Sequence, residues 1–240
     1  MIKKDLISIG EAASILRVSI DTLRRWDKSG KLNSVKTEGG HRKYYRSQLE
    51  FFLNDLYKLA KNWVLKGATL NPDFYCSNSA VFQTRLTRMQ DLMGSVKELA
   101  STFPLIIAVA GEIGNNSFDH NLGSWPDVPG IFFGYDINKK IIVLADRGLG
   151  ILATLKRVKP ELCTDSEALK VAFTEIISGR FPESRGNGLK FVRKIVSENQ
   201  IGILFQTGNA ELILEKDSDT LDIRNVEESF RGTLALITFY

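Results

Sequence analysis

The chain of 240 residues is longer than one small module needs, and it fits a small domain joined to one of roughly 100 to 150 residues. Its 43% apolar and 25% charged residues are typical of a globular chain with a proper core, which excludes general disorder. The longest apolar run, Leu105 to Ala110, is far short of the roughly 20 residues that span a bilayer, so we expect a cytoplasmic protein without membrane contact. Cys76 and Cys163 form no CxxC pair, so neither a zinc site nor a disulfide framework is supported.

Positive charge is concentrated in the N-terminal quarter of the chain. Residues 1–66 hold 14 lysines and arginines against 7 acidic residues, whereas residues 67–240 hold 18 against 21. Such a local excess suits a module that neutralises phosphates, and it also suits a solvated basic face.

Two short helices are predicted near the N-terminus. The first lies within Ile7–Leu16, where Ser8 can cap the helix and Glu11 follows three residues later. After a break, Ser19 can cap a second helix over residues 20–28. Two short helices joined by a tight turn indicate a helix-turn-helix.

The second helix has an inward face and an outward basic face. Leu23 and Trp26 can pack inward. The side chains left available to a DNA major groove are Thr22, Arg24, Arg25 and Lys28. The segment from Val35 to Tyr45 then predicts a hairpin, in which Gly39-Gly40 can adopt the positive φ of a tight turn. A basic hairpin beside a recognition helix is a wing.

The run EAASILRVSIDTLRRWDKSGKL followed by GGHRKY resembles the winged helix domains of the MerR and excisionase type over about residues 5–55. The resemblance implies binding of double-stranded DNA. The residues assigned to the major groove or its phosphates are Ser19, Thr22, Arg24, Arg25 and Lys28, and those assigned to the backbone or minor groove are His41, Arg42 and Lys43. The alternative is a small protein-binding helical module with a solvated basic face.

Residues 56–103 are helical in character and form a predicted connector between domains at 1–55 and 104–240. Apolar residues there are spaced alternately by four and three, at Phe82, Leu86, Met89, Met93, Val96 and Ala100. That stripe is typical of the seam of a short coiled coil, which would make the chain a homodimer, and equally of a helix lying on the next domain. Symmetric DNA half-sites favour the dimer.

A polar helix face is predicted within LIIAVAGEIGNNSFDHN, although Gly111 and Gly114 weaken the helix. Glu112, Asn116 and His120 are spaced by four, so a helix places them on one face. An amide oxygen at Asn116 can hold Mg²⁺, His120 can approach phosphate, and Glu112 can orient or deprotonate a nucleophile.

Three further elements follow this helix. Residues 130–146 indicate two apolar strands joined by a short turn, and the second strand ends at Asp146. The loop Arg147–Ile151 completes a D-x-G-x-G-I motif, in which glycines allow close backbone approach and the carboxylate can accept from an amino group such as that of adenine. The run SRGNGL precedes a helix to Glu198, which suits capture of phosphate at a helix start. Gly232-Thr233 begins the predicted last strand.

Together these four motifs resemble the GHKL ATPase superfamily over about 130 residues. The resemblance implies an α+β chain, with a two-layer α/β sandwich of the Bergerat type on a mixed, mainly antiparallel sheet. It also implies the cofactors ATP and Mg²⁺, a metal-binding Asn116, an adenine-reading Asp146, and Thr233 helping to hold Asp146 and adenine through water. The remaining residues of the implied ATP site are His120, Gly148, Gly150, Ile151, Gly186, Gly188 and Leu189.

Two other nucleotide-binding motifs are excluded. The run GLGILA fits a dinucleotide fingerprint, but a hairpin precedes it, Pro160 interrupts the following helix, and the other motifs would be left unexplained. No GxxxxGK[ST] loop is present, which excludes a P-loop ATPase.

Three functions remain open. His41 and His120 are the only histidines, so a conventional histidine kinase is not supported. We expect a DNA-binding transcription regulator whose ATP site controls DNA binding or assembly. The first alternative is an anti-sigma-type protein serine/threonine kinase targeted to DNA, with Glu112 as catalytic base and a protein partner as substrate, or a slow ATPase. The second is a mobile-element excision accessory factor.

Overall fold

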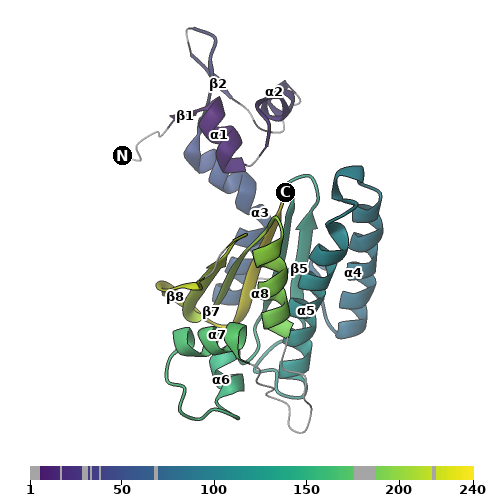
Figure 1. Cartoon of the computed structure of the whole chain (residues 1–240), viewed down its shortest axis with the longest axis vertical. Coiled ribbons are helices and arrows are strands. Elements are labelled where there is room, and N and C mark those ends of the chain that lie inside the picture. The colour runs from purple at the N-terminus through teal and green to yellow at the C-terminus, as the bar shows by residue number, and fades with distance from the viewer. Residues whose placement is uncertain are drawn as a thin grey trace. The chain divides into compact units, whose positions relative to one another are not determined.

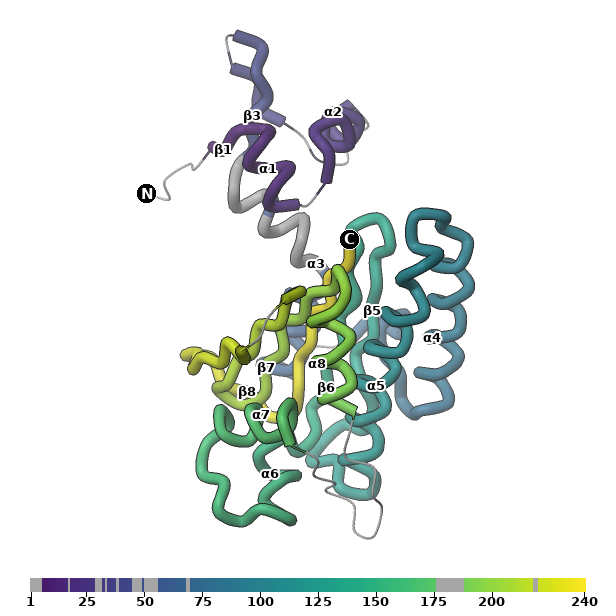
Figure 2. The backbone as a smooth tube through the Cα atoms, viewed as in Figure 1, coloured from purple at the N-terminus to yellow at the C-terminus, as the bar shows by residue number. Residues whose placement is uncertain are grey.

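The chain folds into two compact units, Met1–Lys58 and Leu59–Tyr240 (Figures 1 and 2). The structure is a computed structural model, and it describes residues 6–16, 18–28, 32, 34–37, 39–67, 70–175, 188–217 and 220–240, with the backbone alone at 45–48 and 50–55. The architecture confirms the predicted fold class, because a small winged helix-turn-helix is followed by an α+β unit on an antiparallel sheet.

The smaller unit is a helix pair packed on a three-stranded sheet. Its elements are β1 (Leu6–Ser8), α1 (Ile9–Leu16), α2 (Ile20–Lys28), β2 (Val35–Lys36), β3 (Arg42–Tyr45) and the start of α3 (Arg46–Lys66). The strands are antiparallel in the order β1-β3-β2. Leu23 and Tyr44 lie fully buried at its centre, and Trp26 packs against the same cluster.

Local hydrogen bonds explain where the two helices begin. Ser8 Oγ accepts from the N–H of Glu11, and the carboxylate of Glu11 accepts from the N–H of Ser8, which is a reciprocal capping box. Ser19 Oγ accepts from the N–H of Thr22 at the start of α2. Gly40 has a φ of 75° in the turn between β2 and β3. The predicted caps and the predicted wing are therefore confirmed.

The larger unit is built on a five-stranded antiparallel sheet with the order β4-β5-β6-β8-β7. Its further elements are β4 (Tyr75–Cys76), α4 (Ser79–Gly94), the 3-10 helix η1 (Lys97–Leu99), α5 (Phe103–Asn121), β5 (Ile131–Asp136), β6 (Ile141–Asp146), α6 (Ile151–Leu155), α7 (Asp165–Thr174), α8 (Gly188–Glu198), β7 (Ile201–Leu214) and β8 (Asp222–Phe239). The two central strands β6 and β8 pair so that Asp146 lies opposite Thr233. The topology thus brings two predicted site residues together.

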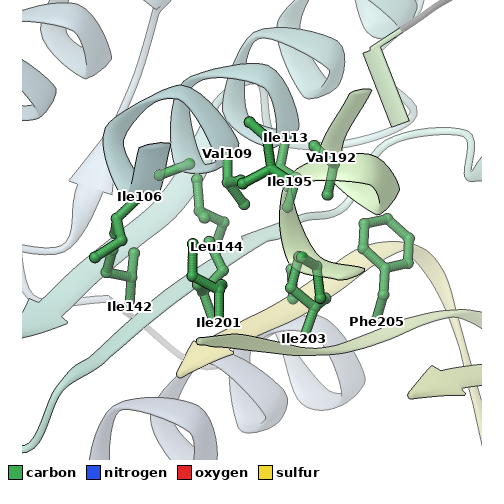
Figure 3. Close-up of a cluster of buried hydrophobic side chains, with 14 of the residues drawn as sticks. Ile106, Val109, Ile113, Ile142, Leu144, Val192, Ile195, Ile201, Ile203 and Phe205 are labelled. Atoms are coloured by element: carbon green, nitrogen blue, oxygen red, sulfur yellow. The ribbon is translucent and has the colours of Figure 1, made fainter. Parts of the chain in front are cut away.

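Helices α5 and α8 cover one face of this sheet (Figure 3). Alternate residues of the strands point toward the helices, because side chains along a strand alternate between the two faces. The buried contacts join Ile106, Val109 and Ile113 of α5 and Val192 and Ile195 of α8 to Ile142, Leu144, Ile201, Ile203 and Phe205 of the strands. Helices α6 and α7 lie side by side at the end of the sheet where β6 finishes (Figure 2).

The last residues of α3 belong to the larger unit and lie behind the sheet in Figure 1, on the face away from α5 and α8. Trp63 is buried there, and the guanidinium carbon of Arg147 lies 5.9 Å from the centre of its ring. Val143 and Ala145, which alternate with the residues facing α5, are also buried. Helices α5 and α8 therefore form the second layer on one face of the sheet, and the C-terminal end of α3 covers part of the other face.

The apolar stripe of α4 is buried within the same unit. Phe82, Leu86, Met89 and Met93 belong to the core cluster that includes α5. A Cβ at Gly114 would lie 2.2 Å from Cζ of Phe82, so that glycine lets the two helices approach each other. The coiled-coil interpretation of this stripe is wrong, and the alternative, a helix lying on its own domain, is correct.

The last strand begins earlier than the sequence predicts. Strand β8 starts at Asp222 and not at Gly232, and its first half forms a ribbon with the end of β7. The register shifts on β7 between Thr207 and Ala210, and Gly232 has a φ of 96°. The predicted start lies at this irregularity within a longer strand.

Among the helices that the structure describes, none combines the length and the apolar character that crossing a bilayer requires.

Candidate functional site

Helix α5 presents two rows of side chains to the site. Asn116 and His120 lie one turn apart, as the spacing predicts. Ile113, Ser117 and Asn121 form a second row with the same spacing, and all three are buried. The helix forms in spite of its glycines, and Gly114 leaves the room in which Phe82 packs against it.

Asp146 is almost completely buried at the end of β6. Its Oδ2 accepts from Ser117 Oγ at 2.8 Å and from Thr233 Oγ1, and its Oδ1 accepts from the N–H of Gly148 at 2.8 Å. Burial raises the pKa of Asp146, although these hydrogen bonds favour the ionised form. The result is a carboxylate in a fixed orientation, surrounded by neutral donors.

Asn121 fixes the loop that follows Asp146. Its Nδ2 donates to the carbonyl oxygen of Ser117 at 2.7 Å, and its Oδ1 accepts from the N–H of Leu149 at 2.8 Å. A Cβ at Gly148 would lie 2.1 Å from Nδ2 of Asn121. Gly148 is therefore required by the packing of this amide against the loop.

Two further glycines bring backbone segments close to Asp146. A Cβ at Gly232, whose φ is 96°, would lie 2.1 Å from the carbonyl oxygen of Asp146. Gly150 has a φ of 79° and lies next to the hydroxyl of Thr207, which donates to the carbonyl oxygen of Gly232 at 2.9 Å and accepts from the N–H of Ile151. The loop and the last strand are thus tied together beside the carboxylate.

The start of α8 reaches the polar face of α5. A Cβ at Gly188 would lie 3.0 Å from Oε1 of Glu112 and 3.2 Å from Nδ2 of Asn116. The first N–H groups of a helix have no partner within it and attract negative charge. A helix start, a carboxylate and an amide therefore converge here.

These elements enclose a pocket with about 750 Å³ of space, part of it open to solvent. Its polar groups lie among apolar side chains. The lining residues are Ile113, Asn116, Ser117, His120, Asn121, Asp146, Gly150, Ile151, Thr154, Leu155, Ala172, Gly188, Leu189, Phe205 and Thr233.

His120 lines this pocket as a neutral imidazole. Burial lowers its pKa, and the positive charge of Arg157 lowers it further. A neutral imidazole has one donor and one acceptor nitrogen. His120 is therefore a hydrogen-bonding group at neutral pH and carries no charge for a phosphate.

A second concave surface lies on the smaller unit, between α2 and the wing. Its lining is basic except for one aspartate, and consists of Arg24, Arg25, Asp27, Lys28, Lys36 and Arg42. Asp27 accepts from Arg42 Nε at 2.7 Å and from the N–H of Ser34 at 2.8 Å. The groove thus combines outward cations of α2 with cations of both wing strands.

A comparison with known protein families agrees with the helix-turn-helix structure of the smaller unit. Residues 8–44 match the family described as MerR family regulatory protein. The N-terminal unit carries a MerR-family helix-turn-helix. The type II methyltransferase M.Eco47II of Escherichia coli is 41% identical to this chain over 61 residues, which are 25% of this chain and 15% of that protein.

Among solved structures, the 43K ATPase domain of Thermus thermophilus gyrase B, in complex with an aminocoumarin, aligns with 63% of this chain. The sequence identity is 14%, the TM-score is 0.35, and the alignment covers 40% of that chain. This chain therefore spans well under two thirds of the length of both relatives. At this TM-score the likeness says nothing about ligand or activity.

The structure brings most of the predicted ATP-site residues together. Those that line the pocket are Asn116, His120, Asp146, Gly150, Ile151, Gly188, Leu189 and Thr233. Gly148 lies behind the lining and donates its N–H to Asp146. Glu112 approaches Gly188 but does not line the pocket that the described residues form. Gly186 lies outside the described residues. The binding and catalytic roles of all these residues stay predictions.

Sequence reasoning missed Ser117 and Asn121. Both occur at the four-residue spacing of the buried row of α5, in register with Ile113, so the same periodicity that selected Asn116 and His120 was a usable signal. Phe205 and Thr207 had no local signal, because β7 enters the site through sheet topology alone.

The predicted DNA-binding residues divide into exposed cations and structural groups. Arg24, Arg25 and Lys28 are exposed on the MerR-type recognition helix α2, and the side chain of His41 is exposed beside the wing turn. Ser19 and Thr22 share a hydrogen bond at the helix start, and Lys43 lies at the centre of the three-stranded sheet in register with Ser8 and Val35. Sequence reasoning missed Lys36 and Asp27 of the groove.

Proposed function

We propose that this chain is a DNA-binding regulator whose larger unit binds Mg-ATP and thereby controls DNA binding or assembly. The observation that carries the proposal is the buried carboxylate of Asp146, which is held in orientation inside a pocket that Asn116 and the start of α8 also line.

The chemistry around Asp146 fits an adenine ring. A carboxylate is an acceptor, and adenine carries an exocyclic amino donor where guanine carries a carbonyl oxygen. Ser117 and Thr233 hold the carboxylate through their hydroxyls. Apolar side chains such as Ile113 and Phe205 offer surfaces for a flat ring. We therefore expect adenine nucleotides to bind and guanine nucleotides to be disfavoured, because guanine would leave an acceptor facing an acceptor.

The start of α8 and Asn116 fit phosphate and Mg²⁺. Gly188 and Leu189 open α8, where free N–H groups suit phosphate oxygens. Asn116 offers an amide oxygen, and Mg²⁺ commonly binds one or two protein oxygens together with the phosphates of a nucleotide. No cluster of three acidic, histidine or cysteine side chains occurs within the described residues, so the nucleotide would have to supply most of the ligands.

The MerR-type unit supports the DNA part of the proposal. Arg24, Arg25 and Lys28 project from α2, and Lys36 and Arg42 extend the positive surface into the wing. A recognition helix with exposed cations suits the major groove, and a basic wing suits the adjacent backbone. Transcription regulation and a homodimer matched to symmetric half-sites belong to the same proposal.

Glu112 supports a second candidate, phosphoryl transfer to a protein partner or slow hydrolysis. Its carboxylate lies one helical turn before Asn116 and close to Gly188, where a base would act on a nucleophile near the phosphate end. The kinase and excision-factor alternatives predict phosphate transfer to a co-purified protein and DNA bending with a recombinase, respectively.

The test is binding of a fluorescent ATP analogue with Mg²⁺ to the full chain, to Asp146→Asn and to the control Asp136→Asn. Asp136 ends the neighbouring strand β5 and lies outside the pocket. Loss of a buried, charge-assisted hydrogen bond of about 1.5–3 kcal/mol predicts roughly 10-fold to 150-fold weaker binding for Asp146→Asn. Asp136→Asn should bind the analogue as tightly as the wild type. GTP should compete poorly.

Failure of the wild type to bind would refute the nucleotide assignment. Selection of DNA from a randomised pool, with and without Mg-ATP, then tests whether the nucleotide controls DNA binding. An enriched sequence whose affinity does not respond to the nucleotide would keep DNA binding and refute regulation by ATP.

A further inference from the structure

One acidic side chain lies within the basic groove of the smaller unit. Asp27 belongs to the last turn of α2, and its side chain is only 13% exposed. The other groups that line the groove are five cations, on α2 at Arg24, Arg25 and Lys28 and on the wing at Lys36 and Arg42. By charge alone, an aspartate at this place repels DNA phosphates and weakens binding.

The hydrogen bonds of Asp27 explain its presence. Its Oδ2 accepts from Nε of Arg42, the first residue of β3, at 2.7 Å. Its Oδ1 accepts from the N–H of Ser34, the residue before β2, at 2.8 Å. One carboxylate therefore joins the recognition helix to the start of β3 and to the residue that precedes β2.

The ion pair is favoured where it stands. Burial raises the pKa of Asp27, but the hydrogen bonds from Arg42 and Ser34 outweigh this effect, so the pKa is lower than usual. Charge-assisted hydrogen bonds of this length are stronger than neutral ones, and partial burial protects them from screening by salt. By contrast, Asp21 on the same helix is 82% exposed and pairs with Arg24 on the surface.

We propose that Asp27 is a positioning residue for DNA binding: it fixes the wing against α2, and Arg42 acts through this clamp and not as an independent phosphate contact. The inference rests on the proposed DNA-binding function, and it goes beyond it by changing the role of Arg42. The phosphate contacts of the groove are then Arg24, Arg25, Lys28 and Lys36.

This clamp, the ion pair and hydrogen bond that Asp27 makes with the wing, and simple electrostatics predict opposite changes in DNA affinity when Asp27 loses its charge. Removing a negative charge from a basic groove strengthens DNA binding if charge alone matters. If Asp27 positions the wing, Asp27→Asn weakens binding although the net charge becomes more positive. Asp21→Asn is the matched control, because it removes the same charge from the same helix without touching the wing, and it should bind equally well or more tightly.

The experiment measures the affinity of the full chain for a duplex that the wild type enriches from a randomised pool, by fluorescence anisotropy at several salt concentrations. We expect Asp27→Asn to weaken binding at least about tenfold and Asp21→Asn not to weaken it. Arg25→Gln should reduce the salt slope by about 0.9, the value of one released counterion, whereas Arg42→Gln should reduce it no further once Lys36→Gln has removed the wing contact. The double variant Asp27→Asn with Arg42→Gln should bind no more weakly than the weaker single variant.

Wild-type or tighter binding by Asp27→Asn would overturn the clamp. A further fall in salt slope, equal to that for Arg25→Gln, when Arg42→Gln is added to Lys36→Gln would also overturn it, and this second measurement stays decisive if Asp27→Asn fails to fold. If the wild type enriches no duplex, the DNA-binding function itself fails, which is a separate result seen without any variant.

Discussion

Replacing Gly148 by alanine tests whether one buried amide sets the loop after Asp146. The added Cβ would lie 2.1 Å from Nδ2 and 2.3 Å from Cγ of Asn121, far inside the 3.5–4.0 Å at which carbon atoms meet favourably. Asn121 is 3% exposed and cannot swing into solvent without losing its bonds to Ser117 and Leu149. Either the amide or the loop must move.

The expected cost follows from these contacts. Two hydrogen bonds at about 0.5–1.5 kcal/mol each are lost or distorted. Overpacking of a tight site costs about 1–3 kcal/mol, and this overlaps in part with the cost of the distorted hydrogen bonds. We therefore expect Gly148→Ala to lower the free energy of unfolding by about 2–4 kcal/mol, which for a domain of this size is roughly 5–15 °C in Tm.

The assay is urea unfolding of the full chain followed by tryptophan fluorescence, with a double-mutant cycle. Asn121→Ala alone should cost about 1–3 kcal/mol. In its background there is room for the new Cβ, so the double variant should be more stable than the sum of the two costs predicts. Gly94→Ala is the control, because a Cβ there meets only Phe103 at 3.7 Å. Additive costs, or a neutral Gly148→Ala, would refute the proposed packing of the loop.

Three further predictions concern the same unit. Burial raises the pKa of Asp146 in the folded state, so ionisation of this carboxyl opposes folding, and the free energy of unfolding should fall as pH rises through the folded pKa. Urea unfolding at a series of pH values should show this fall in the wild type. A parallel fall in Asp146→Asn would contradict it. Phe82→Ala should lower the free energy of unfolding by about 3–5 kcal/mol, because Phe82 is fully buried. Phe191→Ala is the control and should change it by no more than about 0.5 kcal/mol, because Phe191 is 46% exposed. Equal costs in urea unfolding would contradict the burial of the α4 stripe. Gly232→Ala should destabilise by more than about 1 kcal/mol, since φ is 96° and the Cβ meets Asp146; an unchanged Tm would count against this.

The smaller unit was predictable because its signals are local. The Ser8 and Ser19 caps lie within three residues of their partners, and the wing turn depends on Gly40. The clamp was not predictable, because Asp27 and Arg42 are 15 residues apart and only the packed hairpin brings them together. An aspartate in a basic helix had no feature that separated it from the exposed Asp21.

The larger unit shows where periodicity is ambiguous. The stripe of α4 has the same spacing whether it faces another chain or α5, and the deciding contact is between Phe82 and Gly114, far apart in sequence. The early half of β8 was missed because residues 222–229 are exposed or half-buried and carry several charges, so neither face shows an apolar alternation. Such a ribbon is held by its partner strand, in contacts such as Arg224 with Glu211, and by Ile223, which packs against the core.

Two aspartates illustrate how environment decides the role of one residue type. Asp27 is neutralised by the guanidinium of Arg42, so its charge is already matched within the protein and its effect is mechanical. Asp146 accepts from the hydroxyls of Ser117 and Thr233 and from backbone N–H groups. These neutral donors orient its carboxylate without neutralising the charge, and burial raises its pKa while that of Asp27 is lowered. A buried charge with neutral neighbours gains more from a new donor than one already paired with a cation. The neutral partners of Asp146 therefore favour ligand recognition there, and the paired cation favours positioning at Asp27.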